Sequence, residues 1–485
     1  MARSPWVSWL ALVASCGSAH GGDGTDGTEA SSAGAGSSTD EAATGSTEGD
    51  AATTSTTGDA DTTAAASDGS SAVCGNAVVE PGEHCDGEDV LGVPCPVDCR
   101  FPSGFELWAT TFDGNGGNSP LSSNDHPLAV AAADDAIVVV GSLGTVDNGD
   151  AGLVARLSRS GELQWMVGHV AVVRHAGQHR ATGVVIDRDV VLVTGIASRS
   201  VWTAGFDAFD GTLLDQDIVV GPNPDSDYLP GNPALRPDGT IVVVGASDFP
   251  SDAPGFILSY DPLGTAPTVE WFSGPEYAPG FSQLAGLQGV VTDDDQLLVT
   301  GLAFQPGGDA WMQRRTFDGD VLWGVTDGDN GSAFTRAALL PDGSFAVAMD
   351  RRPEATADEA IWVGRYDPSG KPRWSEMWSS EPGTDATPAG VAADEQGRVY
   401  VLGTIADDTS PSPAGRDYDM VVLAYDAEGN QLWEDIYSGQ GMGGGEYSWD
   451  YARAITIDPD GFIVTTGCTM TPTNQYDVIV RVLAP

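Results

Sequence analysis

Short apolar runs alternate with polar turns from about residue 104 to the end of the chain. Seven of the runs are similar to one another, and their ends lie 54, 50, 56, 48, 54 and 64 residues apart: IVVVG (137–141), VLVTG (191–195), IVVVG (241–245), LLVTG (297–301), FAVAM (345–349), VYVLG (399–403) and IVTTG (463–467). Apolar positions at a period of two, with turns of the D-G and P-D-G kind, predict antiparallel strands and almost no helix.

Each repeating unit predicts four strands. A strand with small residues and an acidic turn precedes the apolar run, as in ARAITIDPDG, and a strand with a basic or aromatic residue follows it, as in GLVARLSRSG. A fourth strand starts at the glycine of that last turn and has tryptophan four residues later in Gly161/Trp165, Gly319/Trp323, Gly370/Trp374 and Gly429/Trp433. Two units differ, because Gly211 leads to Asp215 and Gly264 reaches Trp271 through a longer turn. Four-stranded units of this length are typical of propeller blades.

The seventh unit ends after three strands, at DVIVRVLAP, whereas GFELWATTFDG (104–114) has the pattern of a fourth strand and precedes every repeat. The sequence therefore predicts an all-β fold: a seven-bladed β-propeller over residues 104–485, closed when the N-terminal strand pairs with the three C-terminal ones. Closure removes two exposed sheet edges. The repeated tryptophans are expected to pack between blades on the outer strands, and the small residues of the first strands to line the centre of the ring.

The repeated phrase D-x-x-V-x-R-x-D-x-x-G-x-x-x-W resembles the SBBP-type β-propeller repeats of bacterial exported proteins. The resemblance covers most of residues 104–485 and implies the fold rather than an activity. A weaker similarity links the Gly and Trp positions to quinoprotein dehydrogenases. Seven units instead of eight, the absence of an adjacent cysteine pair and the presence of one lysine, Lys371, argue against a quinone enzyme.

The N-terminus has the features of an export signal. Arg3 precedes an apolar run from Trp6 to Ala14, which is too short to span a bilayer. The ending V-A-S-C resembles the lipobox of bacterial lipoproteins, which implies a signal peptide over residues 1–15 and lipid attachment at Cys16. The sorting aspartate after the cysteine is absent, because residue 17 is Gly17. The expected location is the cell envelope, at the outer membrane or cell surface, with the N-terminal lipid as the only membrane contact.

Residues 16–73 are rich in Gly, Ser, Thr, Ala, Asp and Glu. Such a composition cannot bury enough apolar surface to offset the entropy of ordering, so it predicts a disordered acidic linker. A flexible coil of this length spans about 40 Å. The linker would hold the folded part away from the membrane.

Residues 74–101 place four cysteines at the spacing C-x10-C-x9-C-x3-C. The phrase CGN…PGEHCD and the trailing cysteine pair resemble the small cysteine-rich repeat of myxobacterial surface lipoproteins. In an oxidising compartment a module this small is expected to form two disulfides from Cys74, Cys85, Cys95 and Cys99, in one of three pairings. Zinc binding by the thiolates is the alternative, and the acidic turn Asp86–Asp89 could hold calcium.

The chain carries 70 acidic and 21 basic residues, a net charge of -49. Such a charge repels phosphates and anionic lipid surfaces, which excludes nucleic acid and makes a membrane surface a poor partner.

Few residues suggest catalysis or metal binding. The histidines His169, His175 and His179 fall in a joining segment rather than on a helix, which argues against a metal site. The acidic phrases 147–150, 292–295 and 416–419 fit hairpin turns. No nucleophile elbow, P-loop or zinc-protease motif occurs. The sequence thus predicts no catalytic residue and no cofactor, with calcium as the one ion that its acidic turns could bind.

The predicted function is that of a monomeric, lipid-anchored binding module, more in keeping with a non-enzyme. A protein or glycan would bind the loops of one propeller face, which are more variable in length than the strands. Among these loops, Tyr447, Trp449 and Tyr451 could stack on a sugar. The alternative function is an extracellular polysaccharide hydrolase or lyase that uses carboxylates at the mouth of the central channel.

Overall fold

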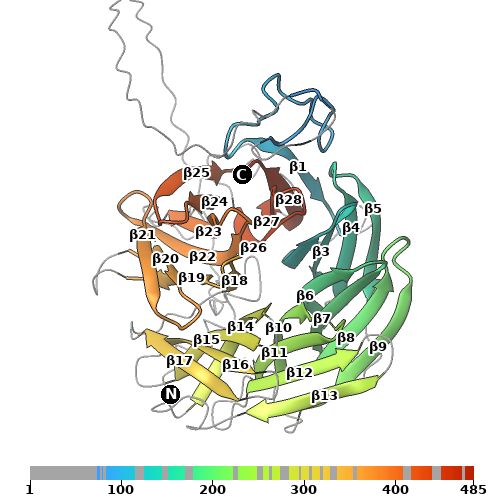
Figure 1. Cartoon of the computed structure of the whole chain (residues 1–485). Helices are drawn as coiled ribbons and strands as arrows, with labels where there is room; N and C mark the ends of the chain where they lie inside the picture. The colour runs from blue at the N-terminus through green and yellow to red at the C-terminus, as the bar shows by residue number, and fades with distance from the viewer. Residues whose placement is uncertain are drawn as a thin grey trace, which may run out of the picture.

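In the computed structural model, seven four-stranded antiparallel sheets surround a common axis (Figure 1). The structure describes residues 74–76, 79, 83–114, 125–144, 151–169, 179–221, 228–236, 238–247, 255–261, 265–272, 283–293, 296–304, 309–316, 320–327, 336–352, 358–407, 417–439, 449–471 and 476–485. Within these residues all regular elements are strands, and no helix that could cross a bilayer is found. The predicted all-β, seven-bladed propeller is confirmed.

Each blade has its strands in the order first, second, third, fourth from the axis outward. The first strands are β2 (His126–Ala132), β6 (His179–Asp187), β10 (Tyr228–Leu235), β14 (Gln283–Asp293), β18 (Ala337–Leu339), β22 (Thr384–Ala393) and β26 (Tyr451–Ile457). The second strands are β3 (Ala136–Leu143), β7 (Val190–Ala197), β11 (Ile241–Ser247), β15 (Gln296–Phe304), β19 (Phe345–Arg351), β23 (Val399–Asp407) and β27 (Ile463–Met470).

The third strands are β4 (Ala151–Ser158), β8 (Ser200–Asp207), β12 (Gly255–Asp261), β16 (Asp309–Thr316), β20 (Ala360–Tyr366), β24 (Asp417–Tyr425) and β28 (Tyr476–Leu483). The fourth strands are β5 (Leu163–His169), β9 (Leu213–Val219), β13 (Thr265–Phe272), β17 (Val321–Asp327), β21 (Pro372–Trp378), β25 (Gln431–Tyr437) and β1 (Glu106–Phe112). We number the blades from 1 (β2–β5) to 7 (β26–β28 with β1).

The seven apolar runs form the second strands, as their composition requires. β3 and β27 are buried along their whole length because each lies inside a sheet that is covered on both faces by neighbouring blades. The fourth strands alternate between exposed and half-buried residues, as in β25, and so form the outer rim. Contacts between successive first strands, β26 with β2 and β2 with β6 among them, close the inner wall of the ring.

The ring closes where β1 pairs with β28, and Thr110 lies opposite Val480. In the other blades a covalent turn joins the third and fourth strands, as where Ser158 N–H donates to Glu162 O and Gly161 N–H to Ser158 O. In blade 7 the two chain ends reproduce both bonds: Ala484 N–H donates to Phe105 O at 2.8 Å, and Gly104 N–H to Ala484 O at 3.0 Å. We call this junction the seam.

An arginine strengthens the seam. The Arg481 side chain, only 3% exposed, extends from β28 to Glu106 of β1 at 2.6 Å and to Asp435 of blade 6 at 2.7 Å. Its guanidinium also lies 4.6 Å from the ring centre of Tyr437. The Arg481 guanidinium thus links strands from both ends of the folded chain. Removing either carboxylate would leave its buried charge without compensation, which is destabilising.

Tryptophans of the fourth strands pack between blades, as predicted. Each lies against a turn glycine of the next blade, in the pairs Trp108/Gly161, Trp165/Gly211, Trp323/Gly370, Trp374/Gly429 and Trp433/Gly104. The indole N–H donates to a carbonyl of the same turn at 3.0 to 3.1 Å for Trp108, Trp165, Trp323 and Trp374. The glycines have positive φ and leave room for the indole, which explains the Gly and Trp spacing of the repeat.

The glycine that ends most second strands is required by a bulge in the first strand. In blade 7 the register shifts at Arg453, and a Cβ on Gly467 would lie 2.3 Å from the carbonyl oxygen of Tyr451. The same shift and the same close approach occur at Gly141, Gly195, Gly245 and Gly403. In blade 5 the run ends in Met349 instead, and the described pairing of β18 covers three residues without a shift.

The cysteine module rests on the seam. Disulfides join Cys74 to Cys99 and Cys85 to Cys95, which selects one of the three pairings open at the sequence level. Cys85, Cys99 and Phe101 belong to the same apolar cluster as β1, β28 and Phe462. Phe101 contacts Phe462 with ring centres 6.3 Å apart. Docking on the propeller thus supplies the apolar core that the module lacks.

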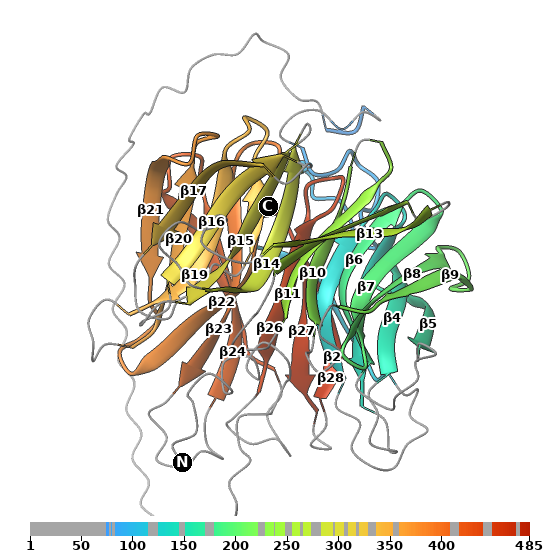
Figure 2. The same ribbon diagram turned by 90° about the horizontal axis from the view of Figure 1, so that it is seen from below.

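The two edges of the ring differ. Short turns such as 236–240 and 426–430 join first to second and third to fourth strands at one edge, the turn edge. Connections such as 113–125 and 438–450 join strand ends at the opposite edge, the loop edge. The module precedes β1 and therefore lies at the turn edge, in blue at the top of Figure 2.

The seam predicts different effects of alanine at two glycines of similar backbone conformation. Gly104 and Gly461 have φ of 74° and 88°, so alanine costs each about 1–2 kcal/mol. At Gly104 the new Cβ would also lie 3.1 Å from Trp433, whereas Gly461 has no atom within 4 Å. We expect Gly104→Ala to lower the free energy of unfolding in urea by about 1–3 kcal/mol more than Gly461→Ala. Equal losses would show that the indole does not support the seam.

Candidate functional site

Basic side chains of three consecutive blades meet at the loop edge of the inner wall. His126 begins β2, Arg180 is the second residue of β6, and Arg453 is the bulged residue of β26. His126 and Arg180 occupy the same register, because each is paired with the residue that follows the second-strand glycine. All three are half-buried between fully buried neighbours, as expected for side chains that face the axis. We call these three residues the basic cluster.

The charges of the cluster act on one another. Burial lowers the pKa of His126 to about 3, with further contributions from the positive charges of Arg453 and Arg180, so the imidazole is neutral at pH 7. Burial also lowers the pKa of Arg453 to about 10, and the charge of Arg180 adds to this effect. The Arg453 guanidinium thus stays charged at pH 7, near a neutral imidazole and inside a strongly acidic protein.

Aromatic residues adjoin the basic cluster. The ring centres of Tyr418 and Tyr451 are 4.7 Å apart, those of Trp449 and Tyr476 6.3 Å, and those of Tyr451 and Tyr476 6.1 Å. These four residues form the aromatic cluster. It touches the basic cluster twice, because Arg453 lies 6.0 Å from the Tyr451 ring centre and His126 6.5 Å from that of Tyr476.

The hydroxyls of Tyr451 and Tyr476 stay protonated at neutral pH. Burial raises the pKa of Tyr451 and of Tyr476 well above the usual value for tyrosine. Tyr451 is hydrogen-bonded to both Tyr418 and Tyr476, so the three hydroxyls form a connected network. Such a network orients and stacks against a ligand more readily than it abstracts a proton.

A further arginine crosses the axis, to the strand position in blade 1 that Arg453 occupies in blade 7. Arg336 Nη2, at the start of blade 5, donates to Leu128 O of blade 1 at 3.1 Å. The two residues belong to blades on opposite sides of the ring (Figure 1). Burial lowers the pKa of Arg336 to about 10. The centre is thus spanned by a polar side chain rather than lined throughout by small residues, which corrects the expectation from the first strands.

Carboxylates at the loop edge connect blades rather than converge on the axis. Asp125 accepts from Gly114 N–H at 2.6 Å, Asp450 from Gly439 N–H at 2.5 Å, and Asp385 from Glu359 N–H at 2.8 Å. Asp125 and Asp450 also donate their own N–H groups to Tyr476 O and Tyr418 O. Each therefore holds the start of one blade to its predecessor. The positions of His126 and Arg453 have equivalents in the first strands of the other blades. Among the described residues at these positions, none is Asp or Glu.

One group of carboxylates could hold a cation. Oxygen atoms of Asp113, Asp125 and Asp477 lie within 4.8 Å of one another at the junction of blades 7 and 1. Burial raises the pKa of Asp125 to about 7, and the charges of Asp113 and Asp477 contribute. Burial and Asp113 raise the pKa of Asp477 to about 6. Hard oxygen ligands of this kind suit calcium, which would relieve the repulsion among the three carboxylates. A proton on Asp125 relieves the same repulsion.

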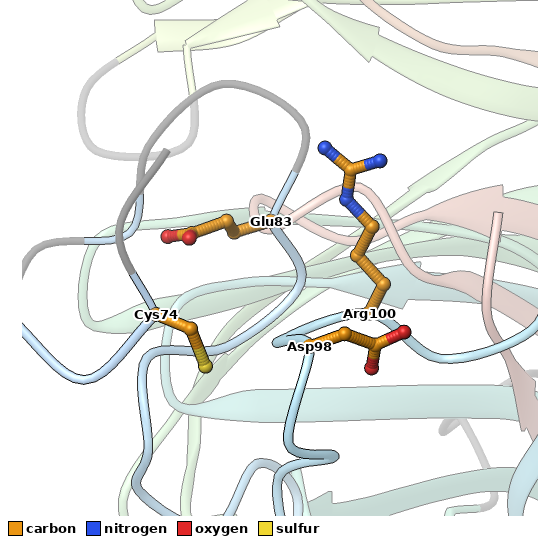
Figure 3. A pocket seen from close by; sticks show the side chains of 4 residues that line it. All are labelled: Cys74, Glu83, Asp98 and Arg100. Carbon is orange, nitrogen blue, oxygen red and sulfur yellow. The ribbon is translucent and has the colours of Figure 1, made fainter. Parts of the chain in front are cut away.

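A shallow pocket of about 300 Å³ lies on the cysteine module and is lined by Cys74, Glu83, Asp98 and Arg100 (Figure 3). The charged groups do not converge: the Glu83 carboxylate points to the side of Cys74, the Asp98 carboxylate points away from it, and the Arg100 guanidinium points away from both (Figure 3). Such an arrangement gives neither an acid–base pair nor a metal site, and Cys74 is in a disulfide.

The structure separates the other candidate residues. His169 ends β5, stacks on Trp202 with ring centres 5.1 Å apart and contacts Gln216. His179 begins β6. His175 lies outside the described residues. Asp86 accepts from Gly75 N–H and from Asn76 N–H, the latter at 3.0 Å, and so stabilises the module. Also outside the described residues are 147–150, Tyr447, Cys16 and all of 1–73.

Of the acidic phrases singled out in the sequence, only 292–295 joins a described hairpin, because Asp293 of β14 pairs with Gln296 of β15. Residues 417–419 belong to β24 and not to a turn, which corrects the hairpin interpretation there. Aspartates of other short turns do stabilise hairpins. The Asp367 carboxylate accepts from the N–H groups of Ser369 and Lys371, and Asp426 binds Glu428 and Asn430 in the same way. Asp458 repeats the pattern with Asp460 and Phe462.

Sequence reasoning missed the basic cluster, although a signal was present. The second-strand glycine marks the bulge of the preceding strand, and the bulged residue and the one two positions before it face the axis. Arg453 and Arg180 occupy such positions. Trp449 and Tyr451 were singled out from the sequence, but Tyr418 and Tyr476 come from third strands that only the fold brings beside them.

No protein-family model and no curated protein matches this sequence. Solved structures that resemble it include the Dos1 propeller, at 10% identity and a TM-score of 0.42 over 72% of this chain and 74% of the other. An ulvan lyase matches at 9% identity and a TM-score of 0.48 over 75% and 94% of the two chains. An α-L-arabinofuranosidase of Fusarium graminearum matches at 13% identity and 0.40 over 61% and 89%. At such identities the likeness concerns the propeller fold alone.

The Asp113, Asp125 and Asp477 group predicts a pH-dependent effect of Asp125→Asn. Because the pKa of Asp125 is raised in the folded state, the bound proton stabilises the protein at low pH, and this stabilisation is lost as pH rises through about 7. The amide needs no proton and still accepts from Gly114. We expect the melting temperature of the variant to exceed that of the wild type by roughly 2–4 °C more at about pH 8 than at about pH 5.

Asp210→Asn is the control, since Asp210 lies in an exposed turn. A difference that does not change with pH would contradict the role assigned to Asp125. Repeating the scans in calcium and in chelator separates the two ways of relieving the repulsion: a calcium site would stabilise the wild type but not Asp125→Asn.

Proposed function

We propose that this protein is a lipid-anchored binding module of the cell surface whose loop edge captures an extracellular glycan or protein. The observation that carries the proposal is that the two edges of the ring differ. The cysteine module, which follows the linker, occupies the turn edge, whereas the basic and aromatic clusters lie at the loop edge. A tether that ends at the turn edge would direct the loop edge away from the membrane.

The composition of the loop edge favours binding over catalysis. Half-buried rings of Tyr418, Trp449 and Tyr451 offer flat apolar surface with polar tips, which suits a sugar ring or a protein side chain. The neighbouring carboxylates accept backbone N–H groups and hold blades together. A hydrolase or lyase with carboxylates at the channel mouth, the alternative function, gains no support from the described first-strand residues at the registers of the basic cluster.

The lipid anchor rests on the sequence. Residues V-A-S-C before the acidic segment provide the acylation signal at Cys16, and several acyl chains bind a membrane stably. The expected location is the outer membrane or the cell surface, with the propeller held outward by residues 16–73. Calcium bound by Asp113, Asp125 and Asp477 would strengthen the junction of blades 7 and 1 without taking part in ligand binding.

The binding proposal is tested by screening the purified protein on an array of glycans and envelope proteins beside two aromatic variants. Trp449→Ala alters the loop edge, and Phe209→Ala removes an 86% exposed ring from a turn at the other edge. We expect Trp449→Ala to weaken binding about tenfold and Phe209→Ala to leave it unchanged. Melting temperatures show whether both variants are folded.

Binding that survives Trp449→Ala unchanged, or the absence of any ligand, would refute the assignment of the loop edge. The anchor is tested separately, because Cys16→Ser should move the protein from the membrane fraction to the soluble fraction after cell lysis. A variant that stays with the membranes would show that Cys16 is not acylated.

A further inference from the structure

We propose that the cysteine module is a site of thiol–disulfide exchange, at which a small carboxylate-bearing thiol forms a mixed disulfide with Cys74. Exchange at this site would be independent of ligand binding at the loop edge, because the module lies at the turn edge.

Each disulfide of the module joins a buried cysteine to a more accessible one. Cys99 and Cys85 are 0% exposed, whereas Cys74 is exposed and Cys95 is half-buried. A thiolate from solution therefore reaches the Cys74–Cys99 bond at Cys74, and the buried Cys99 is the leaving group.

Cys74 also lines the pocket of about 300 Å³ on the module, a volume at the lower end of those that hold small molecules (Figure 3). Arg100 lines the same pocket and makes no ion pair within the described residues, so its guanidinium is available to a carboxylate. Glu83 and Asp98 add negative charge that suits an ammonium group. A thiol of the amino-acid type carries both kinds of group.

The second disulfide can take up the sulfur that this attack releases. A thiolate at Cys99 would be poorly solvated in the apolar cluster, which makes it a poor leaving group by itself. A turn in which Cys99 N–H donates to Pro96 O at 2.9 Å brings Cys95 close, and the Sγ atoms of Cys95 and Cys99 are 3.7 Å apart. A rotation of the Cys99 side chain is then enough to reach a new partner within the module.

The exchange balances in atoms and electrons. The thiol sulfur bonds to Cys74 as the Cys74–Cys99 bond breaks, and Cys99 bonds to Cys95 as the Cys85–Cys95 bond breaks. Cys85 leaves as a thiolate and takes up the proton that the incoming thiol lost, so two disulfides and one thiol exist before and after.

The product keeps the module docked. A neutral Cys85 thiol behaves as a small apolar side chain and can remain in the apolar cluster that holds the module on the seam. Cys99 stays bonded within the module, and the added thiol is carried by the exposed Cys74.

The test exposes the purified full-length protein to reduced glutathione without air, stops the reaction with acid at early times, and maps the four cysteines by mass spectrometry after denaturation and alkylation. We expect the first product to carry glutathione on Cys74, a Cys95–Cys99 disulfide and a free Cys85.

The pocket is tested by Arg100→Gln. This variant should slow the first step by roughly threefold or more with glutathione, but not with mercaptoethanol, which has no carboxylate. Arg188→Gln is the matched control, because Arg188 is 89% exposed in a turn of blade 2 and should leave both rates unchanged.

The wild-type product map decides the inference without any variant. Glutathione first found on Cys85 or Cys95, an intact Cys85–Cys95 bond beside the Cys74 adduct, reduction of both disulfides with no adduct at Cys74, or no reaction of the folded protein would each overturn it. Equal slowing of glutathione and mercaptoethanol by Arg100→Gln would also overturn it, because the pocket would then select no carboxylate.

Discussion

The fold depends on a junction between the two ends of the folded chain. Ala484 and Gly104 exchange the backbone hydrogen bonds that a covalent turn makes in the other blades, and β1 completes the sheet begun by β26, β27 and β28. Without that strand, blade 7 would expose the edge of β28, and Trp108 would no longer pack on blade 1. Arg481 and the cysteine module both act at this junction, so side-chain charge and disulfides reinforce a closure that has no covalent bond of its own.

The seam also determines at which edge of the ring the cysteine module lies. Because β1 starts at the turn edge, the module and the chain before it are placed on that side, and the loop edge is left for ligands. The same strand arrangement brings β26, β2 and β6 together as consecutive first strands, which assembles His126, Arg180 and Arg453 from residues far apart in sequence. The grouping of these three side chains is thus a consequence of how the ring closes.

The sequence alone predicted the number of blades, the closure and the packing of the tryptophans, because each depends on local patterns that recur along the chain. It also predicted disulfides among Cys74, Cys85, Cys95 and Cys99, but not their pairing, which depends on how the module folds. The basic cluster escaped notice because each member is a single residue in its own blade. Arg336 was missed for the same reason, since its partner Leu128 lies across the ring.

The most direct measurement is a cysteine cross-link across the seam. Thr110 and Val480 lie opposite each other in β1 and β28, whereas Val478 is opposite Phe112. Under mild oxidation, Thr110→Cys with Val480→Cys should form a disulfide and raise the free energy of unfolding in urea by up to about 5 kcal/mol over the single variants. The out-of-register pair, Thr110→Cys with Val478→Cys, should form it poorly. If the in-register pair failed to oxidise in the folded protein, or if both pairs cross-linked equally, the ring would not close by pairing these two strands.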